Sequence, residues 1–174
     1  TSLLFLLFGF SLMMLMRWQL AYPGQPIPLV GDLLGVANAP GGIMLPEFYN
    51  QLVAMHGSVM VFLAVVPLAA GAFANYFIPL KIGAPEMAFP RLNALSYWLY
   101  LVAGLIMVTS FFVEGGAANS GWTSYAPLAV IATSGQNYWL AGIFLLGLSS
   151  ALNAINVLVT IVQCRAAGAA WTNL

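Results

Sequence analysis

The chain has 174 residues, of which 62% are hydrophobic and only 5% charged, and its formal net charge is zero. Since a soluble domain carries about 25% charged residues, this composition excludes a water-soluble globular protein, and we expect one all-α, polytopic transmembrane domain over residues 1–174. A neutral chain also lacks the basic patches that nucleic-acid binding requires. The single cysteine, Cys164, excludes a disulfide framework within the chain and a multi-cysteine metal site.

Four stretches of the sequence are long and apolar enough for a membrane-spanning helix, which needs about 20 mainly apolar residues. The predicted spans cover about residues 1–21, 51–80, 95–113 and 138–163. The second span contains Pro67 and Pro79, and prolines are tolerated in membrane helices but kink them. Because the sequence starts inside an apolar run without an initiator methionine, we expect a fragment of a longer polypeptide.

The few charged residues predict how the spans are oriented. Three of the four basic residues fall on one side of the predicted bundle: Lys81, Arg91 and Arg165. Glu86 lies on the same side, whereas Arg17 lies toward the other. Since basic residues are in excess on the inner side of membranes, this side is expected to face the cytoplasm or matrix. Residues 22–50 and 114–137 then face outward.

His56 is the only histidine in the sequence and lies in the second predicted span, about five residues from its start. An ionisable side chain in a bilayer is costly and marks a functional site by default. The residues alone leave two interpretations open: a hydrogen bond to a neighbouring helix, or axial ligation of a haem or metal, for which Gly57 would leave room. Arg17 is expected at a similar depth, either as an anchor whose charge reaches the interface or as a donor to a cofactor.

Polar residues also follow one face of the fourth predicted span, at offsets of four, three and four. They are Ser149, Asn153, Asn156 and Thr160. Such a stripe indicates hydrogen bonds between helices, which is the commoner case, or the lining of a water-filled path. Asn75 leaves the same two alternatives, and Glu86 lies where a carboxylate could collect protons from solvent.

Five segments, in order along the chain, resemble subunit 1 of the haem–copper oxidases. They are residues 17–24 (RWQLAYPG), 48–60 (FYNQLVAMHGSVM), 75–93 (NYFIPLKIGAPEMAFPRLN), 121–128 (GWTSYAPL) and 154–156 (AIN). The Met-Ala-Phe-Pro-Arg form of the third segment is more similar to the branch of the family that uses cytochrome c than to the branch that uses quinol.

The resemblance implies a role for each matching residue. His56 would be an axial ligand of the iron of a low-spin haem, expected to be of the haem a type. Arg17 would donate a hydrogen bond to the formyl group of that haem, and Trp122 would lie near its propionates. Four residues would line the entry of a proton-uptake channel: Glu86, Asn75, Asn93 and Asn156.

The resemblance also implies that the chain is part of the catalytic subunit of a terminal oxidase. Such an enzyme passes electrons from cytochrome c through haem to oxygen, which is reduced to water, and translocates protons across a bacterial or mitochondrial inner membrane. Its partners would be other oxidase subunits, including one with a dinuclear copper site. The high-spin haem, the copper and the oxygen-reducing residues would lie in the rest of the subunit, which has about twelve helices.

Some positions depart from the family pattern, and other functions remain open. Glu86 stands where an aspartate is usual, Ala94 where an asparagine is common, Asn153 where a glycine is common, and Gln19 where some members have an acidic residue. The alternatives are a quinol oxidase of the same family, a relative similar to nitric oxide reductase, and a membrane scaffold or transporter piece with no cofactor.

Overall fold

The computed structural model describes residues 1–168, and within them four helices are long and apolar enough to cross a membrane. These spans are Ser2–Ala21, Pro46–Ile82, Pro90–Phe112 and Gly135–Gln163. No strand occurs within the described residues, so the expected all-α, polytopic architecture is confirmed. Shorter helical turns lie in the connections, namely η1 (Asp32–Leu34), η2 (Pro40–Gly42) and α5 (Leu128–Ile131).

The first span is α1 (Ser2–Ala21), and the fourth is α6 (Gly135–Gln163). The second is continuous through α2 (Pro46–Ser58), η3 (Val59–Val65), η4 (Pro67–Phe73) and α3 (Ala74–Ile82). The third consists of α4 (Pro90–Thr109) and η5 (Ser110–Phe112). Both the second and the third span begin five residues earlier than the apolar runs predict. Each begins at a proline, which suits the first turn of a helix because its missing N–H has no helical partner there.

The second span bends around Pro67 without breaking. Its turns are of the wide π type on both sides of Val66, in η3 and η4. Proline cannot donate the usual backbone hydrogen bond, and wider turns absorb that loss. With 37 residues, the span is about 55 Å long at 1.5 Å per residue. It therefore exceeds the roughly 30 Å hydrocarbon core of a bilayer, so part of the helix must extend beyond that core.

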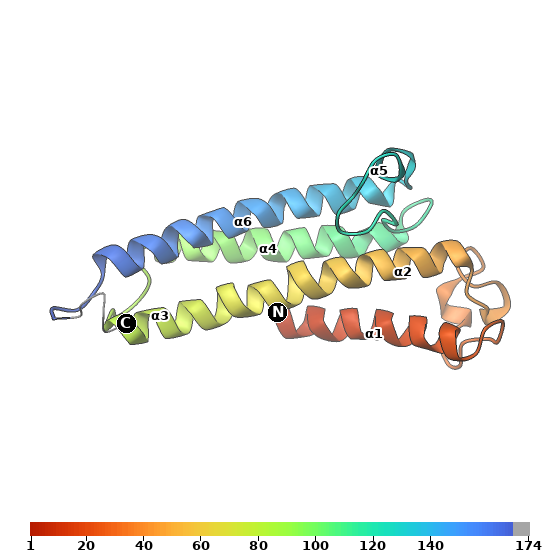
Figure 1. The fold of residues 1–174 in the computed structure, drawn as a ribbon, viewed down its shortest axis with the longest axis horizontal. Helices are drawn as coiled ribbons and strands as arrows, with labels where there is room; N and C mark the ends of the chain where they lie inside the picture. Colours follow the sequence, from red (N-terminus) through yellow and green to blue (C-terminus); the bar gives the residue numbers. More distant parts are fainter. Residues whose placement is uncertain (169–174) are drawn as a thin grey trace.

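The four spans pack as two pairs (Figure 1). In one pair α1 lies along α2 and η3, and in the other α4 lies along α6. The core between the pairs is apolar, and its most buried members include Leu52, Met55, Leu63 and Met107. A hydrogen bond also joins them, since the Tyr100 hydroxyl donates to the Leu63 carbonyl at 2.7 Å.

The end of the bundle at the left of Figure 1 gathers the end of α3, the start of α4 and the end of α6. Lys81 and Arg91 belong to α3 and α4, and Arg165 follows the end of α6, so the three basic residues lie at one end of the bundle, as the sequence predicts. The backbone N–H of Ala166 donates to the Ile82 carbonyl at 2.9 Å, which ties the end of α6 to α3. Arg17 lies near the opposite end, four residues before the end of α1.

Candidate functional site

The His56 side chain is positioned by a backbone group of another helix. Its Nδ1 atom lies 2.9 Å from the carbonyl oxygen of Gly9 on α1. A carbonyl only accepts hydrogen bonds, so Nδ1 carries the proton and the lone pair of the neutral ring lies on Nε2. Within residues 1–168, Nε2 has no hydrogen-bond partner. A histidine whose second nitrogen is tied to a carbonyl is the usual arrangement of a metal ligand.

Two glycines shape the space around this imidazole. A Cβ added to Gly9 would lie 2.7 Å from the Met60 sulfur, so the absent side chain is what lets α1 approach closely enough for the hydrogen bond. A Cβ added to Gly57 would meet nothing within 4 Å. An open face therefore lies directly beside His56, as a flat macrocycle would require.

The donor set decides which kind of metal centre these residues fit. No group of three or more His, Cys, Asp or Glu side chains that could hold a metal ion occurs in the described part of the chain. His56 alone is too little for a bare ion such as zinc, which takes three or four protein ligands. A haem brings four nitrogens of its own and needs the protein only for axial ligands, so the residues fit a haem.

Arg17 and Trp122 lie apart from His56. His56 is level with Gly9, and Arg17 is eight residues farther along α1, which is about 12 Å toward the C-terminal end of that helix. His56 is also ten residues from the start of α2 rather than five. The expectation of similar depth was therefore wrong, because the second helix begins earlier than its apolar run.

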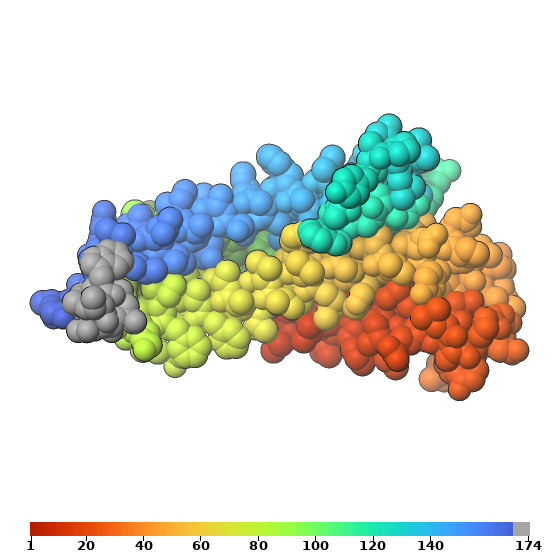
Figure 2. All heavy atoms as spheres, in the orientation of Figure 1, coloured from red at the N-terminus to blue at the C-terminus, as the bar shows by residue number. Residues whose placement is uncertain are grey.

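Trp122 comes from the connection between η5 and α6, and its side chain is 57% exposed. Its ring packs against Phe62, with centroids 6.0 Å apart and planes at 55°. Figure 2 shows this connection lying over the middle of the second span. Trp122 therefore packs against the long helix that carries His56, at Phe62, which is six residues farther along that helix.

The connection that carries Trp122 is held by glutamines that the sequence analysis did not single out. Gln51 is 5% exposed, donates to the Gly115 carbonyl at 3.0 Å and accepts from the Ala117 N–H at 3.1 Å. Gln136 accepts a hydrogen bond from the Ser120 hydroxyl at 2.7 Å, which holds the segment just before Trp122 against the start of α6. Gln51 stands out as an amide at the edge of an apolar run, and that signal could have identified it.

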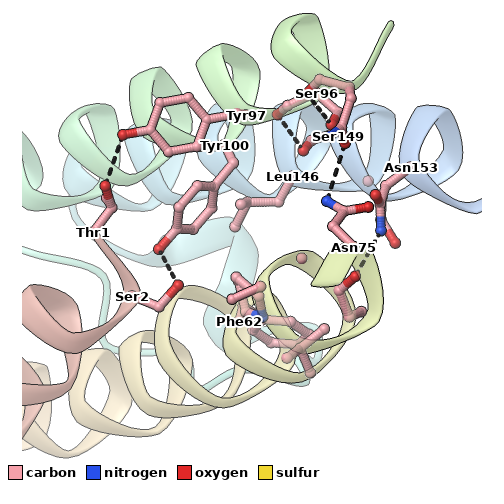
Figure 3. A pocket seen from close by; sticks show the side chains of 18 of the residues that line it. Thr1, Ser2, Phe62, Asn75, Ser96, Tyr97, Tyr100, Leu146, Ser149 and Asn153 are labelled. Atoms are coloured by element: carbon pink, nitrogen blue, oxygen red, sulfur yellow. Dashed lines mark hydrogen bonds between the residues drawn. The ribbon is translucent and has the colours of Figure 1, made fainter. Parts of the chain in front are cut away.

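Glu86, Asn75 and Asn93, all expected in the proton path, meet at the end of the bundle that also carries Lys81 and Arg91. Asn75 of α3 donates from Nδ2 to Oδ1 of Asn93 on α4 at 3.0 Å. A cavity of about 410 Å³ is lined by Glu86, Asn75 and Asn93. A larger cavity of about 770 Å³ extends from the same two asparagines to Phe62 (Figure 3). We call the smaller cavity the outer mouth and the larger one the inner cavity. Asn75 and Asn93 line both, so the asparagine pair lies between them.

The polar stripe of α6 forms hydrogen bonds between helices, one of the two alternatives left open. Ser149 donates to the Ser96 carbonyl at 2.6 Å. Asn156 is fully buried, accepts from the Phe89 N–H at 2.9 Å and donates to the Phe89 carbonyl at 3.3 Å. Asn156 lines neither cavity, and both of its polar atoms hold the connection that carries Glu86.

Comparison with known proteins matches the chain over residues 1–174 to the family described as Cytochrome C and Quinol oxidase polypeptide I. It is 44% identical over 153 residues to cytochrome c oxidase subunit 1 of Thermostichus vulcanus, covering 84% of the chain and 27% of that protein. It is 45% identical over 171 residues to putative cytochrome c oxidase subunit 1-beta of Streptomyces coelicolor, covering 97% and 27%. For heme-copper oxidase subunit I+III of Aeropyrum pernix the identity is 48% over 174 residues, covering 98% and 19%. The chain thus spans about a quarter of the length of the curated relatives it matches.

Proposed function

The chain belongs to the family of cytochrome c and quinol oxidase polypeptide I, and from this premise we propose that it forms the low-spin haem and proton-entry part of the catalytic subunit of a proton-translocating cytochrome c oxidase. Such an enzyme reduces oxygen to water. The relatives named as cytochrome c oxidases favour cytochrome c as electron donor over quinol. The proposed partners are other oxidase subunits, including one with dinuclear copper, and the high-spin haem and copper belong to the rest of the subunit.

His56 carries this proposal. A haem bound there supplies one-electron chemistry, and the chain contributes the ligand and its orientation. The Gly9 carbonyl fixes the tautomer that presents the Nε2 lone pair, at 2.9 Å from Nδ1. Gly57 leaves the adjacent face open. Because the hydrogen bond makes the imidazole more basic, it stabilises the ferric form and helps to set the reduction potential.

Arg17 and Trp122 are proposed to act at the edges of the same haem. Arg17 is exposed at the outer end of α1, and its long side chain can extend back toward the haem plane to donate to a formyl group. Trp122 is held against Phe62 of the helix that carries His56, where an indole N–H can donate to a propionate. A formyl group on the haem implies the haem a type.

Glu86 is proposed as the proton collector, and its end of the bundle as the cytoplasmic or matrix side. It is exposed and lines the outer mouth together with Asn75 and Asn93. The three basic residues at this end agree with the positive-inside rule. Asn156 contributes by fixing the Phe89 backbone, three residues after Glu86.

The ligand assignment is tested in the full-length oxidase with His56→Gly. We expect the absorbance of the low-spin haem to be lost and oxygen consumption with reduced cytochrome c to stop. Added imidazole should restore part of the absorbance, because it can occupy the space of the missing ring. An unchanged spectrum in the variant would contradict the assignment. Comparison of reduced cytochrome c with a quinol as donor to the wild-type enzyme separates the two branches of the family.

The proton path is tested with Glu86→Gln, which keeps the shape of the side chain and removes its charge. We expect slower proton uptake during oxygen reduction and an unchanged haem spectrum. Glu47→Gln is the matched control, since Glu47 is an exposed carboxylate at the opposite end of the second span. Equal rates in both variants and the wild type would exclude Glu86 as the collector.

A further inference from the structure

Asn153 lies on α6, one turn before Asn156, and faces the inner cavity. Its Nδ2 donates to the Ala70 carbonyl of η4 at 3.1 Å, which ties α6 to the wide turns of the second span. This hydrogen bond fixes the orientation of the amide. Its oxygen, Oδ1, is sealed from bulk solvent and has no hydrogen-bond donor in the described chain.

Asn75 presents a second oxygen of the same kind. Its Nδ2 is used by Asn93, whereas its Oδ1 is sealed from bulk solvent and lacks a donor among residues 1–168. Asn75 and Asn153 line the same cavity from α3 and α6 (Figure 3). The inner cavity therefore has two buried acceptors at the end where the asparagine pair closes it.

The two buried acceptors need a hydrogen-bond donor that residues 1–168 do not supply. A buried carbonyl-type oxygen without a hydrogen bond costs about 1–3 kcal/mol, and buried polar groups are satisfied by protein or by ordered water. The cavity volume of about 770 Å³ far exceeds the roughly 30 Å³ that a water molecule occupies in the liquid. Water has two O–H donors and suits two acceptors.

We propose that Asn153 is a positioning residue of the proton-uptake path, holding water beside Asn75 on the inner side of the Asn75–Asn93 pair. This inference rests on the proposed proton path and adds a residue to it, at a position where a glycine is common in the family. A proton that passes the pair moves onto the oxygen of this water, whose two O–H groups donate to the amide oxygens. After the water reorients, it passes a proton to the next water in the direction of Phe62. Ser149 and Asn156 of the same stripe have their polar atoms engaged by Ser96 and Phe89, so Asn153 is the member with a free acceptor.

The test compares two substitutions at this position in the full-length oxidase. Asn153→Leu keeps the volume and removes the acceptor, and we expect proton uptake about tenfold slower, equivalent to about 1.4 kcal/mol in the barrier. Asn153→Ser keeps a hydroxyl acceptor and should stay within about twofold of the wild type. Asn137→Leu is the matched control, because Asn137 is an exposed asparagine on α6 outside the cavity lining.

Two readouts separate this role from a purely structural one. The solvent isotope effect on proton uptake should rise in Asn153→Leu, while the haem spectrum and the rate of haem reduction stay unchanged. A structural defect would instead alter the spectrum or the assembly and leave the isotope effect unchanged. Equal proton-uptake rates for Asn153→Leu and Asn137→Leu would overturn the proposal.

A comparison with Glu86→Gln, and a high-resolution map of the wild-type oxidase where it is needed, keep the proposal testable in every case. If Glu86→Gln slows proton uptake and Asn153→Leu does not, only the role of Asn153 fails; if neither does, the proton path itself fails. Should Asn153→Leu not assemble, a high-resolution map of the wild-type oxidase decides. A water within hydrogen-bond distance of both Asn153 Oδ1 and Asn75 Oδ1 supports the proposal, and its absence there overturns it.

Discussion

Gly9→Ala tests how far the neighbouring helix controls His56. The methyl group would lie 2.7 Å from the Met60 sulfur and 3.3 Å from Val59 Cγ1, where carbon contacts prefer about 3.5–4.0 Å. The flexible Met60 side chain can turn away, but Val59 is fully buried and β-branched. The α1 helix must therefore retreat by a few tenths of an ångström. Alanine is itself favoured over glycine within a helix by about 1 kcal/mol, so the backbone does not oppose the change.

This retreat acts on the hydrogen bond between His56 Nδ1 and the Gly9 carbonyl. Its length of 2.9 Å should increase toward about 3.2 Å, the upper end of the range for such bonds. A bond worth about 1 kcal/mol is then partly lost. The ligand becomes less basic and the ferric form less stable, so the reduction potential should rise by on the order of 20–40 mV, since 59 mV corresponds to a tenfold change for one electron.

The assay is a spectroelectrochemical titration of the low-spin haem in the full-length oxidase. Gly147→Ala is the control, because an added Cβ there meets nothing within 4 Å and its helix, α6, does not carry His56. A rise in the midpoint potential for Gly9→Ala, with no change for Gly147→Ala, is the expected result. An assembled Gly9→Ala enzyme with an unaltered potential would refute the reasoning that this hydrogen bond tunes the haem.

Three other substitutions have outcomes that follow from the same structure. A Cβ added by Gly57→Ala meets no atom of residues 1–168, so a loss of haem absorbance in the assembled full-length variant would indicate contact with the haem itself, and a normal spectrum would place the haem elsewhere. Gln51→Leu leaves the fully buried Ala117 N–H unpaired, at a cost of about 1–3 kcal/mol; proteolysis within residues 113–134 should become faster, whereas the exposed Gln25→Leu control should behave like the wild type. Asn156→Leu removes both side-chain hydrogen bonds to the Phe89 backbone, and the lost stability of about 2–4 kcal/mol should appear as a lower midpoint of thermal unfolding and faster hydrogen exchange of the Phe89 amide; an unchanged exchange rate would count against the clamp.

The four spans were predictable because an apolar run of about 20 residues has no other stable arrangement in a bilayer. The residues at which the second and third spans begin were harder to predict. Residues 46–50 include Glu47 and Asn50, which look like loop in a hydropathy argument, yet Pro46 at the first helical position and Glu47 in the first turn are favourable helix starters. Hydropathy marks the part of a helix inside the membrane, and this helix is longer than the membrane is thick.

The site was predictable in its residue types and not in its contacts. His56 and Glu86 stand out because so few ionisable groups occur in the sequence. The partner of His56 is a backbone carbonyl, at Gly9, and every residue has one, so no side-chain pattern could identify it. Asn153 and Asn156 lie in one polar stripe of the sequence. Only the packing of α6 against its neighbours shows that Asn156 holds the connection at Phe89, whereas Asn153 faces the inner cavity.

The second span relates the two proposed sites through distance. His56 and Asn75 are nineteen residues apart on one helix, about 28 Å at 1.5 Å per residue, where two unit charges interact by only about 0.6 kcal/mol at an effective dielectric constant of 20. An electron near His56 would thus attract a proton at the asparagine pair only weakly. The inner cavity extends to Phe62, which is six residues, or about 9 Å, from His56, and there the attraction reaches about 1.8 kcal/mol. On the proposed function, a water-filled inner cavity would therefore provide the energetic link between electron arrival and proton uptake, because it would bring the proton close enough for the charge on the haem to favour it.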